Sequence, residues 1–97
     1  MYFDPFQQAV EVISLFSTDG TLRPLRFRFK DENDHLQTAQ VLEVLDVKKI
    51  EHVGAERFCY LCKLQATSDP GGEKECHLME LVYTVRPHRW FLTKKLY

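Results

Sequence analysis

The side chains best suited to chemistry in this sequence are three cysteines and the histidine that follows one of them. Cys59 and Cys62 have the Cys-x-x-Cys spacing of a zinc ligand pair, and Cys76 precedes His77. The residues around the first pair, FCYLCKL, form an apolar run typical of a strand, in which positions three apart point to opposite faces. We therefore expect three reduced thiols that pack as small hydrophobic residues, and no bound metal or other cofactor.

Nucleophilic catalysis would need a cysteine or serine, a histidine and an orienting acid close together. The four histidines fall mostly in predicted turns, and no recognisable signature surrounds a serine or cysteine. The acids Asp31, Glu32 and Asp34 lie in a polar stretch where turn formation is their first role. The sequence therefore predicts a protein that is not an enzyme.

Two stretches, residues 22–30 and 84–97, carry basic residues and no acids. Basic side chains interleaved with aromatic rings on a sheet surface are typical of proteins that stack single-stranded nucleic acid. The residues that would form this surface are Arg26, Arg28, Arg89, Phe91 and Lys95. In the interpretation that we favour, the outward arginines instead pair with Glu11, Glu43 and Glu80 on neighbouring strands.

The composition restricts the class of protein further. The 97 residues suffice for one domain, and 13 basic side chains against 14 acidic ones imply no general attraction to nucleic acid or anionic lipid. The first residues lack the pattern of a secretory signal, and no stretch approaches the ~20 apolar residues of a membrane-spanning helix. We expect a single domain, residues 1–97, in the cytoplasm.

The stretch LRPLRFRFK, residues 22–30, organises the predicted fold. With a period of two, it places Leu25, Phe27 and Phe29 on one face and basic residues on the other. Strand patterns also cover residues 9–16, 36–50, 57–66, 76–85 and 89–97, with short turns between them. The sequence thus predicts an all-β fold, a six-stranded antiparallel meander that forms a barrel or strongly coiled sheet, preceded by a short turn or helix around Asp4-Pro5.

Residues 36–50 are open to two interpretations. The alternation changes phase at Val41-Leu42, as in a strand with a β-bulge. An amphipathic helix over Gln37 to Ile50 fits part of the apolar spacing, but the valines in this stretch favour the strand.

Several short runs together resemble a family of short uncharacterised bacterial all-β proteins. The likeness spans about residues 22 to 93, and it lies in Arg23-Pro24-Leu25-Arg26-Phe27-Arg28-Phe29, Val41-Leu42-Glu43-Val44-Leu45-Asp46, Phe58-Cys59-Tyr60, Glu80-Leu81-Val82-Tyr83 and Arg89-Trp90-Phe91-Leu92. Similar domains look related to the C-terminal tail of inactivated Y-family translesion polymerase homologues. The resemblance implies a possible connection with DNA repair.

The number of apolar residues exceeds what one barrel interior needs. The surplus includes Tyr2, Phe3, Phe6, Ile13, Leu15 and Val41, which predicts an exposed patch or a homodimer seam. An open barrel edge would likewise pair with another chain. The sequence therefore favours a protein-interaction module, with a single-stranded nucleic-acid-binding accessory protein as the alternative.

Overall fold

The strand Leu22–Lys30, β2, carries the aromatic side chains at the centre of the protein. In the computed structural model, which describes residues 8–30, 33–67, 75–86 and 88–95, Phe27 is 1% exposed and Phe29 is 8% exposed. Arg26, Arg28 and Lys30, which alternate with them, are exposed. The predicted division of this strand into a core face and a basic face is confirmed.

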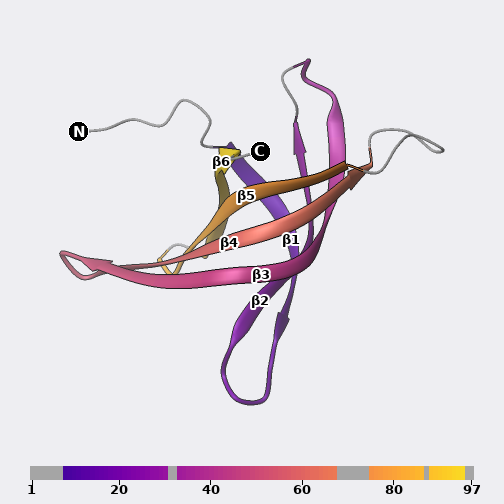
Figure 1. Cartoon of the computed structure of the whole chain (residues 1–97). Coiled ribbons are helices and arrows are strands. Elements are labelled where there is room, and N and C mark those ends of the chain that lie inside the picture. The colour runs from indigo at the N-terminus through magenta and orange to yellow at the C-terminus, as the bar shows by residue number, and fades with distance from the viewer. Residues whose placement is uncertain (1–7, 31–32, 68–74, 87, 96–97) are drawn as a thin grey trace.

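The described residues form an antiparallel meander in which each strand pairs with the next and the last pairs with the first, giving a closed barrel (Figure 1). This confirms the predicted all-β fold, and the interpretation of residues 37–50 as a helix is wrong. The described ranges contain no helix with the length and hydropathy that crossing a lipid bilayer requires. The expected turn or helix in residues 1–7 and the turn at residues 68–72 lie outside the described residues. The strands are β1 (Gln8–Phe16), β2 (Leu22–Lys30), β3 (Leu36–His52), β4 (Ala55–Thr67), β5 (Glu75–Thr84) and β6 (Arg89–Lys95).

A β-bulge in the β1–β2 pair changes which residues of β2 face the core. Ile13 pairs with Arg26 and Ser14 pairs with Pro24, so Leu25 has no partner on β1. Pro24 is buried as a result, and Leu25 is half-buried. The expectation that Leu25 shares the core face with the phenylalanines is therefore corrected: the bulge gives that place to Pro24. The bulge accommodates Pro24, which has no backbone N–H to donate to the ladder.

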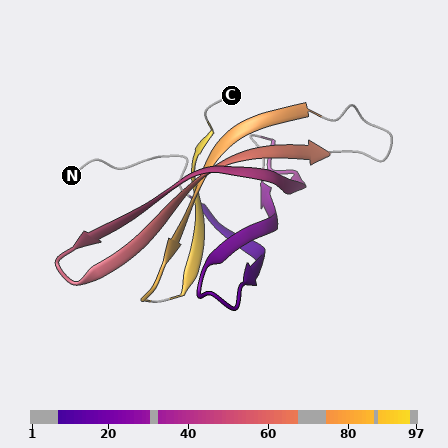
Figure 2. The same cartoon turned by 60° about the horizontal axis from the view of Figure 1, so that its bottom comes forward.

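The strand β3 pairs with only about half of β2. The two pair from Lys30–Leu36 to Arg26–Gln40, and beyond Gln40 β3 pairs with β4 alone among the described strands. Bulges at Leu42 and Leu45 bend β3 at this point, which confirms the predicted change of phase at Val41-Leu42 and adds a second one. The β3–β4 hairpin consequently extends to one side of the barrel, as Figures 1 and 2 show.

The side chain of Tyr60 connects β4 with β2 where β2 is no longer paired with β3. The hydroxyl group of Tyr60, on β4, donates a hydrogen bond of 2.8 Å to the carbonyl oxygen of Leu22, at the start of β2. Leu22 has no partner on β3, so this hydrogen bond satisfies a carbonyl group beyond the last described β2–β3 pair. Burial raises the pKa of the Tyr60 hydroxyl, which keeps it protonated as the donor.

The core lies inside the barrel and is built almost entirely from apolar side chains. Among the described residues, none with a polar or charged side chain is fully buried apart from the tyrosine and cysteine of the core. Val10 and Val12 of β1 pack against this core from one side. Its buried members are Phe27, Phe29, Ala39, Tyr60, Cys62, Leu64, Met79, Leu81 and Leu92.

Replacement of Phe27 by alanine tests the assignment of the core. We expect Phe27→Ala to lower the free energy of unfolding by about 3–5 kcal/mol, because it leaves a cavity among residues that cannot close it. Phe16→Ala is the matched control, since Phe16 is 70% exposed and its loss is expected to change stability by less than about 0.5 kcal/mol. Urea denaturation of both variants measures the difference. Equal effects would contradict this assignment of the core.

Candidate functional site

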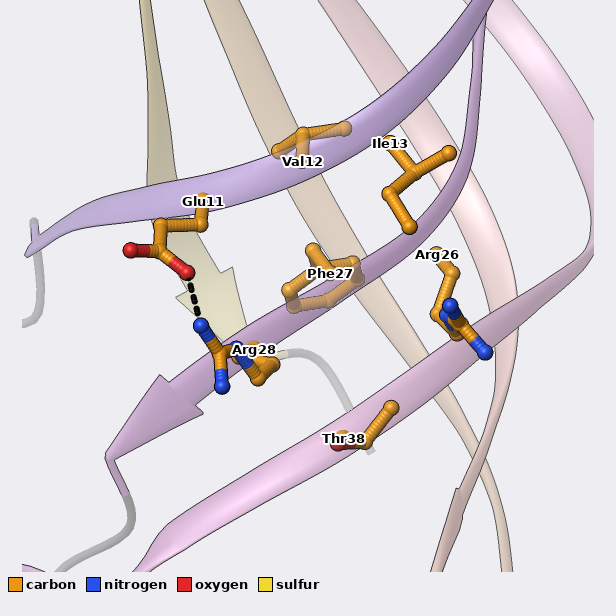
Figure 3. A pocket seen from close by; sticks show the side chains of 7 residues that line it. All are labelled: Glu11, Val12, Ile13, Arg26, Phe27, Arg28 and Thr38. Carbon is orange, nitrogen blue, oxygen red and sulfur yellow. Dashed lines mark hydrogen bonds and ion pairs between the residues drawn. The ribbon is translucent and has the colours of Figure 1, made fainter.

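A groove of about 420 Å³ lies along β1 and β2, where the predicted basic surface begins. Figure 3 shows Arg26 and Arg28 on β2, with Glu11 and Ile13 facing them from β1 and Thr38 beyond them on β3. Two guanidinium groups and a hydroxyl group are suited to an anionic group such as a phosphate. The complete lining is Glu11, Val12, Ile13, Arg26, Phe27, Arg28 and Thr38.

The charge of Arg28 is already engaged within the protein. Its guanidinium group forms an ion pair with the carboxylate of Glu11, the residue opposite it on β1. Both side chains are largely exposed, so the pair contributes only about 0–1 kcal/mol to stability. The pairing of an outward arginine with Glu11 was one of the two interpretations of this strand. It leaves Arg26 as the groove's arginine with no ion-pair partner among the described residues.

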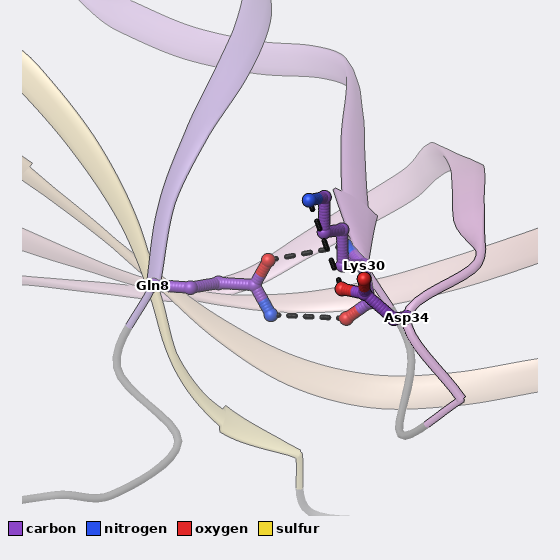
Figure 4. Close-up of polar contacts among 3 residues, drawn as sticks. All are labelled: Gln8, Lys30 and Asp34. Atoms are coloured by element: carbon purple, nitrogen blue, oxygen red, sulfur yellow. Dashed lines mark hydrogen bonds and ion pairs between the residues drawn. The ribbon is translucent and has the colours of Figure 1, made fainter.

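The third basic residue of β2, Lys30, also has an acidic neighbour. Its ammonium nitrogen lies 3.7 Å from Oδ1 of Asp34. The side-chain amide of Gln8 donates to the carbonyl oxygen of Lys30 and accepts from its backbone N–H, both at 3.1 Å (Figure 4). Gln8 thus fixes the end of β2 against β1, and Lys30 adds little unpaired charge to the groove.

The second predicted basic stretch lies on the other side of β1. The guanidinium carbon of Arg89 is 5.3 Å from the centre of the Phe91 ring, a cation–π arrangement on β6. Phe91 pairs with Ala9 of β1, while Glu11 of the same strand pairs with Arg28 of β2. One strand, carrying an acid, therefore separates the two basic stretches.

The remaining predicted site residue, Lys95, lies beyond a register shift in β6. Glu80 pairs with Lys94 and Leu81 with Leu92, so no residue of β5 lies opposite Thr93 in the ladder. Lys95 pairs with Met79. The hydroxyl group of Thr93 donates a hydrogen bond of 2.8 Å to the carboxylate of Glu80. The side chain of Lys95 itself lies outside the described residues.

The β3 edge, defined as residues 41–51, is a part of β3 in which several large apolar side chains are exposed. These residues pair with β4 on one side, and no described strand pairs with them on the other. Leu45 is 45% exposed, Val47 49% and Ile50 40%, and Leu42 is exposed to a similar degree. An unpaired strand edge with apolar side chains is a template for pairing with another chain.

The turn that follows the β3 edge has an unusual residue at its tip. Val53 has φ of 51° and Gly54 has φ of 78°, so both lie in the left-handed region. Glycine and asparagine suit a two-residue hairpin turn of this kind, and a β-branched residue there is strained. Val53 is also 92% exposed. The hairpin therefore presents an apolar side chain at its end as well as along its edge.

Sequence reasoning did not identify the β3 edge as a separate surface. Two signals were present in the sequence: the predicted strand of residues 36–50 is longer than its predicted partner of residues 22–30, and Val44-Leu45 repeats the phase change of Val41-Leu42. A longer strand must leave part of one side unpaired. Of the predicted surplus apolar residues, Ile13 and Leu15 are exposed on β1, and Val41 packs against the core. Tyr2, Phe3 and Phe6 lie outside the described residues.

The cysteines are not arranged as metal ligands in the part of the chain that the structure describes. Cys62 pairs with Met79 and faces the core. Cys59 pairs with Val82 and lies on the opposite face of the sheet. No group of three or more histidine, cysteine, aspartate or glutamate side chains among the described residues is placed to hold a metal ion. Cys59, Cys62 and Cys76 are all reduced thiols, and burial raises the pKa of Cys62 to about 12.

One histidine contacts an aromatic cluster at an end of the barrel. The hydroxyl group of Tyr83 is 2.5 Å from Nδ1 of His88, whose ring stacks on that of Tyr83. Trp90 lies between Tyr83 and Tyr60, with ring centres 5.0 Å and 5.4 Å away. The histidine is exposed, and among the described residues the contacts of this cluster include no carboxylate.

The chain was compared with protein-family models, curated proteins and solved structures. None of them matches it. The comparisons therefore do not bear on the resemblance to the tail of translesion polymerase homologues, which stays a prediction.

The burial of Cys62 predicts a loss of stability at high pH. An unfolded thiol ionises near its ordinary pKa of 9.0, whereas the folded thiol does so at about 12. Between these values the loss of a proton stabilises the unfolded state relative to the folded state, so the free energy of unfolding falls as pH rises from 9 towards 12. We expect Cys62→Ala to show a shallower fall than the unchanged protein when urea midpoints are measured across this range. Parallel curves would contradict the prediction.

Proposed function

We propose that this protein is a non-enzymatic protein-interaction module that binds an extended segment of a partner protein along the β3 edge. The observation that carries the proposal is the coincidence of two features in residues 41–51. Their backbone has no described neighbour opposite β4, and the side chains of Leu45, Val47 and Ile50 are exposed. In β-strand addition, backbone hydrogen bonds supply affinity and alternate side chains supply specificity.

The charges near the edge also suit a protein partner. Glu43, Asp46, Lys48 and Lys49 are exposed and mix both signs along the strand. Such a mixture gives no uniform attraction to a polyanion, but it favours one register of a pairing strand over another.

A second candidate function is that of a single-stranded nucleic-acid-binding accessory protein linked to DNA repair. The contact of Arg89 with Phe91 and the position of Arg26 in the groove favour it, because stacking rings and guanidinium groups are the usual contacts with single strands. Glu11 weakens it, since this acid neutralises Arg28 and lies on the strand between the two basic stretches.

A selected peptide tests the first function. We expect random displayed peptides that bind the immobilised protein to be strand formers with alternating apolar residues. Ile50→Lys is expected to weaken their binding about tenfold or more, because the partner loses the burial of one large apolar side chain. Ile13→Lys is the matched control on β1, since Ile13 is also exposed. Fluorescence anisotropy with labelled peptide gives both affinities, and equal losses in the two variants would rule out the β3 edge as the site.

Removing one acid tests the second function. Glu11→Gln releases the Arg28 side chain, and we expect it to raise the affinity for labelled oligo(dT) about fivefold at low ionic strength. The gain is expected to disappear as salt is added, because it depends on contact with phosphate. Glu51→Gln, on β3, is the control substitution. No salt-dependent binding by either the unchanged protein or Glu11→Gln would eliminate this candidate.

A further inference from the structure

We propose that the partner at the β3 edge is a second copy of this chain, paired antiparallel through a two-fold axis at Val47. The inference rests on the proposed function, because it names the occupant of the same edge. Two sheets would join into one, in the strand order β4–β3 of one copy followed by β3–β4 of the other. A two-fold interface of this kind uses the same surface on both copies.

The symmetry limits the possible registers strongly. Antiparallel strands related by a two-fold axis perpendicular to the sheet have one residue that faces its own counterpart, and residues equally far on either side of it face each other. With the axis at Val47, the two Val47 residues are opposite. Asp46 of each copy then lies opposite Lys48 of the other, so opposite charges meet twice.

Three other registers bring like charges together at the axis. An axis at Asp46 places two aspartates opposite each other, and an axis at Lys48 or Lys49 places two lysines opposite each other. An axis at Ile50 avoids this conflict, but it pairs only the end of the strand beside the turn. The axis at Val47 is close to the middle of residues 41–51, and the bulges at Leu42 and Leu45 end the regular pairing before Glu43 of one copy would lie opposite Glu51 of the other.

The two charges that meet in this register have no other ion-pair partner within the described chain. Asp46 and Lys48 are exposed, and they pair with Leu61 and Cys59 of β4, which places both on the same face of the sheet. The next lysine differs: Nζ of Lys49 is 3.0 Å from Glu51 and 3.9 Å from Glu56, and these carboxylates raise its pKa. The chain thus satisfies the charge of Lys49 internally and leaves Asp46 and Lys48 for a partner.

The local backbone also suits a short regular pairing at this place. The bulges at Leu42 and Leu45 precede Asp46, and from Asp46 to His52 β3 pairs with β4 without interruption. Bulges twist a strand edge and limit unrestricted pairing with other chains. Residues 46–48 are therefore the regular part nearest the centre of the edge. Figure 1 shows β3 along the margin of the hairpin, with no described strand beyond it.

Reversal of the two charges tests the register. By sedimentation velocity, the unchanged protein is expected to shift with concentration from the mass of one chain, 11.5 kDa, towards twice that value. Asp46→Lys and Lys48→Asp are each expected to weaken the dimer about tenfold or more, because each places like charges opposite each other twice. The double variant Asp46→Lys/Lys48→Asp restores opposite pairs and is expected to recover most of the affinity.

The control for these variants is Arg86→Glu, a reversal at an exposed residue in the turn after β5. It is expected to leave the dimer unchanged. A strict monomer at all concentrations, or a dimer that is indifferent to both single reversals, would overturn the proposal. If the protein is a monomer but its selected peptides still lose affinity in Ile50→Lys, the proposed function stands and the second copy is excluded as the partner.

A cysteine at the axis provides an independent measurement. In a protein with Cys59→Ser and Cys76→Ser, Val47→Cys is expected to form a disulfide between two copies on mild oxidation. Directly opposite residues of antiparallel strands have Cα atoms about 4.5–5.5 Å apart, within the range of a disulfide. Val53→Cys, at the exposed hairpin tip, is expected to cross-link far more slowly. Equal rates at the two positions would contradict the register.

Discussion

The separation of β3 from β2 after Gln40 determines most of the features that set this barrel apart from a simple meander. Up to that point the two strands share a ladder, and the core side chains Phe27 and Ala39 are opposite each other. Beyond it, the bulges at Leu42 and Leu45 turn β3 away, and the Tyr60 hydroxyl takes over the carbonyl group of Leu22. One tyrosine thus satisfies a backbone carbonyl group at the place where the β2–β3 pairing ends. The cost of the separation is an exposed edge.

The same separation divides the surface into two regions of different chemistry. Along β1 and β2 the exposed side chains include charged groups as well as Ile13, Leu15 and Phe16, and the backbones of the two strands pair with each other. Glu11 on β1 lies beside Arg28, and Asp34, in the turn after β2, lies beside Lys30. Along the β3 edge the outward side chains are mixed, and apolar groups are exposed beside unpaired backbone. Because acids of the same chain neutralise Arg28 and Lys30, these charges provide little attraction for a partner. An apolar edge gains by acquiring one, because burial of its side chains and pairing of its backbone are both favourable.

Period-two patterns predicted the strands because the core demands them: Phe27 and Phe29 face inward, and the residues between them face water. Such patterns describe one strand at a time, so they indicated the bulge at Val41-Leu42 but not how far β2 follows β3. The place of Leu25 was mispredicted for a related reason, since its bulge is defined by the β1 partner and not by β2 itself. The ion pair of Arg28 with Glu11 could be foreseen as one of two options, but choosing between them required the register of β1 against β2. Edges and registers belong to pairs of strands, and a single sequence specifies them only indirectly.

The closure of the barrel has a consequence for how the chain acquires its structure. Apart from the seam between β1 and β6, every described pairing joins strands that are neighbours in sequence, so each hairpin can form locally at a small loss of chain entropy. The seam joins the two ends of the chain, and its described register runs only from Gln8–Leu92 to Val10–Trp90. It is the contact with the largest sequence separation and among the shortest ladders. We therefore infer that the β1–β6 seam forms last during folding and opens first under native conditions. Its opening would briefly convert the barrel into a curved sheet in which β1 and β6 are two further unpaired edge strands.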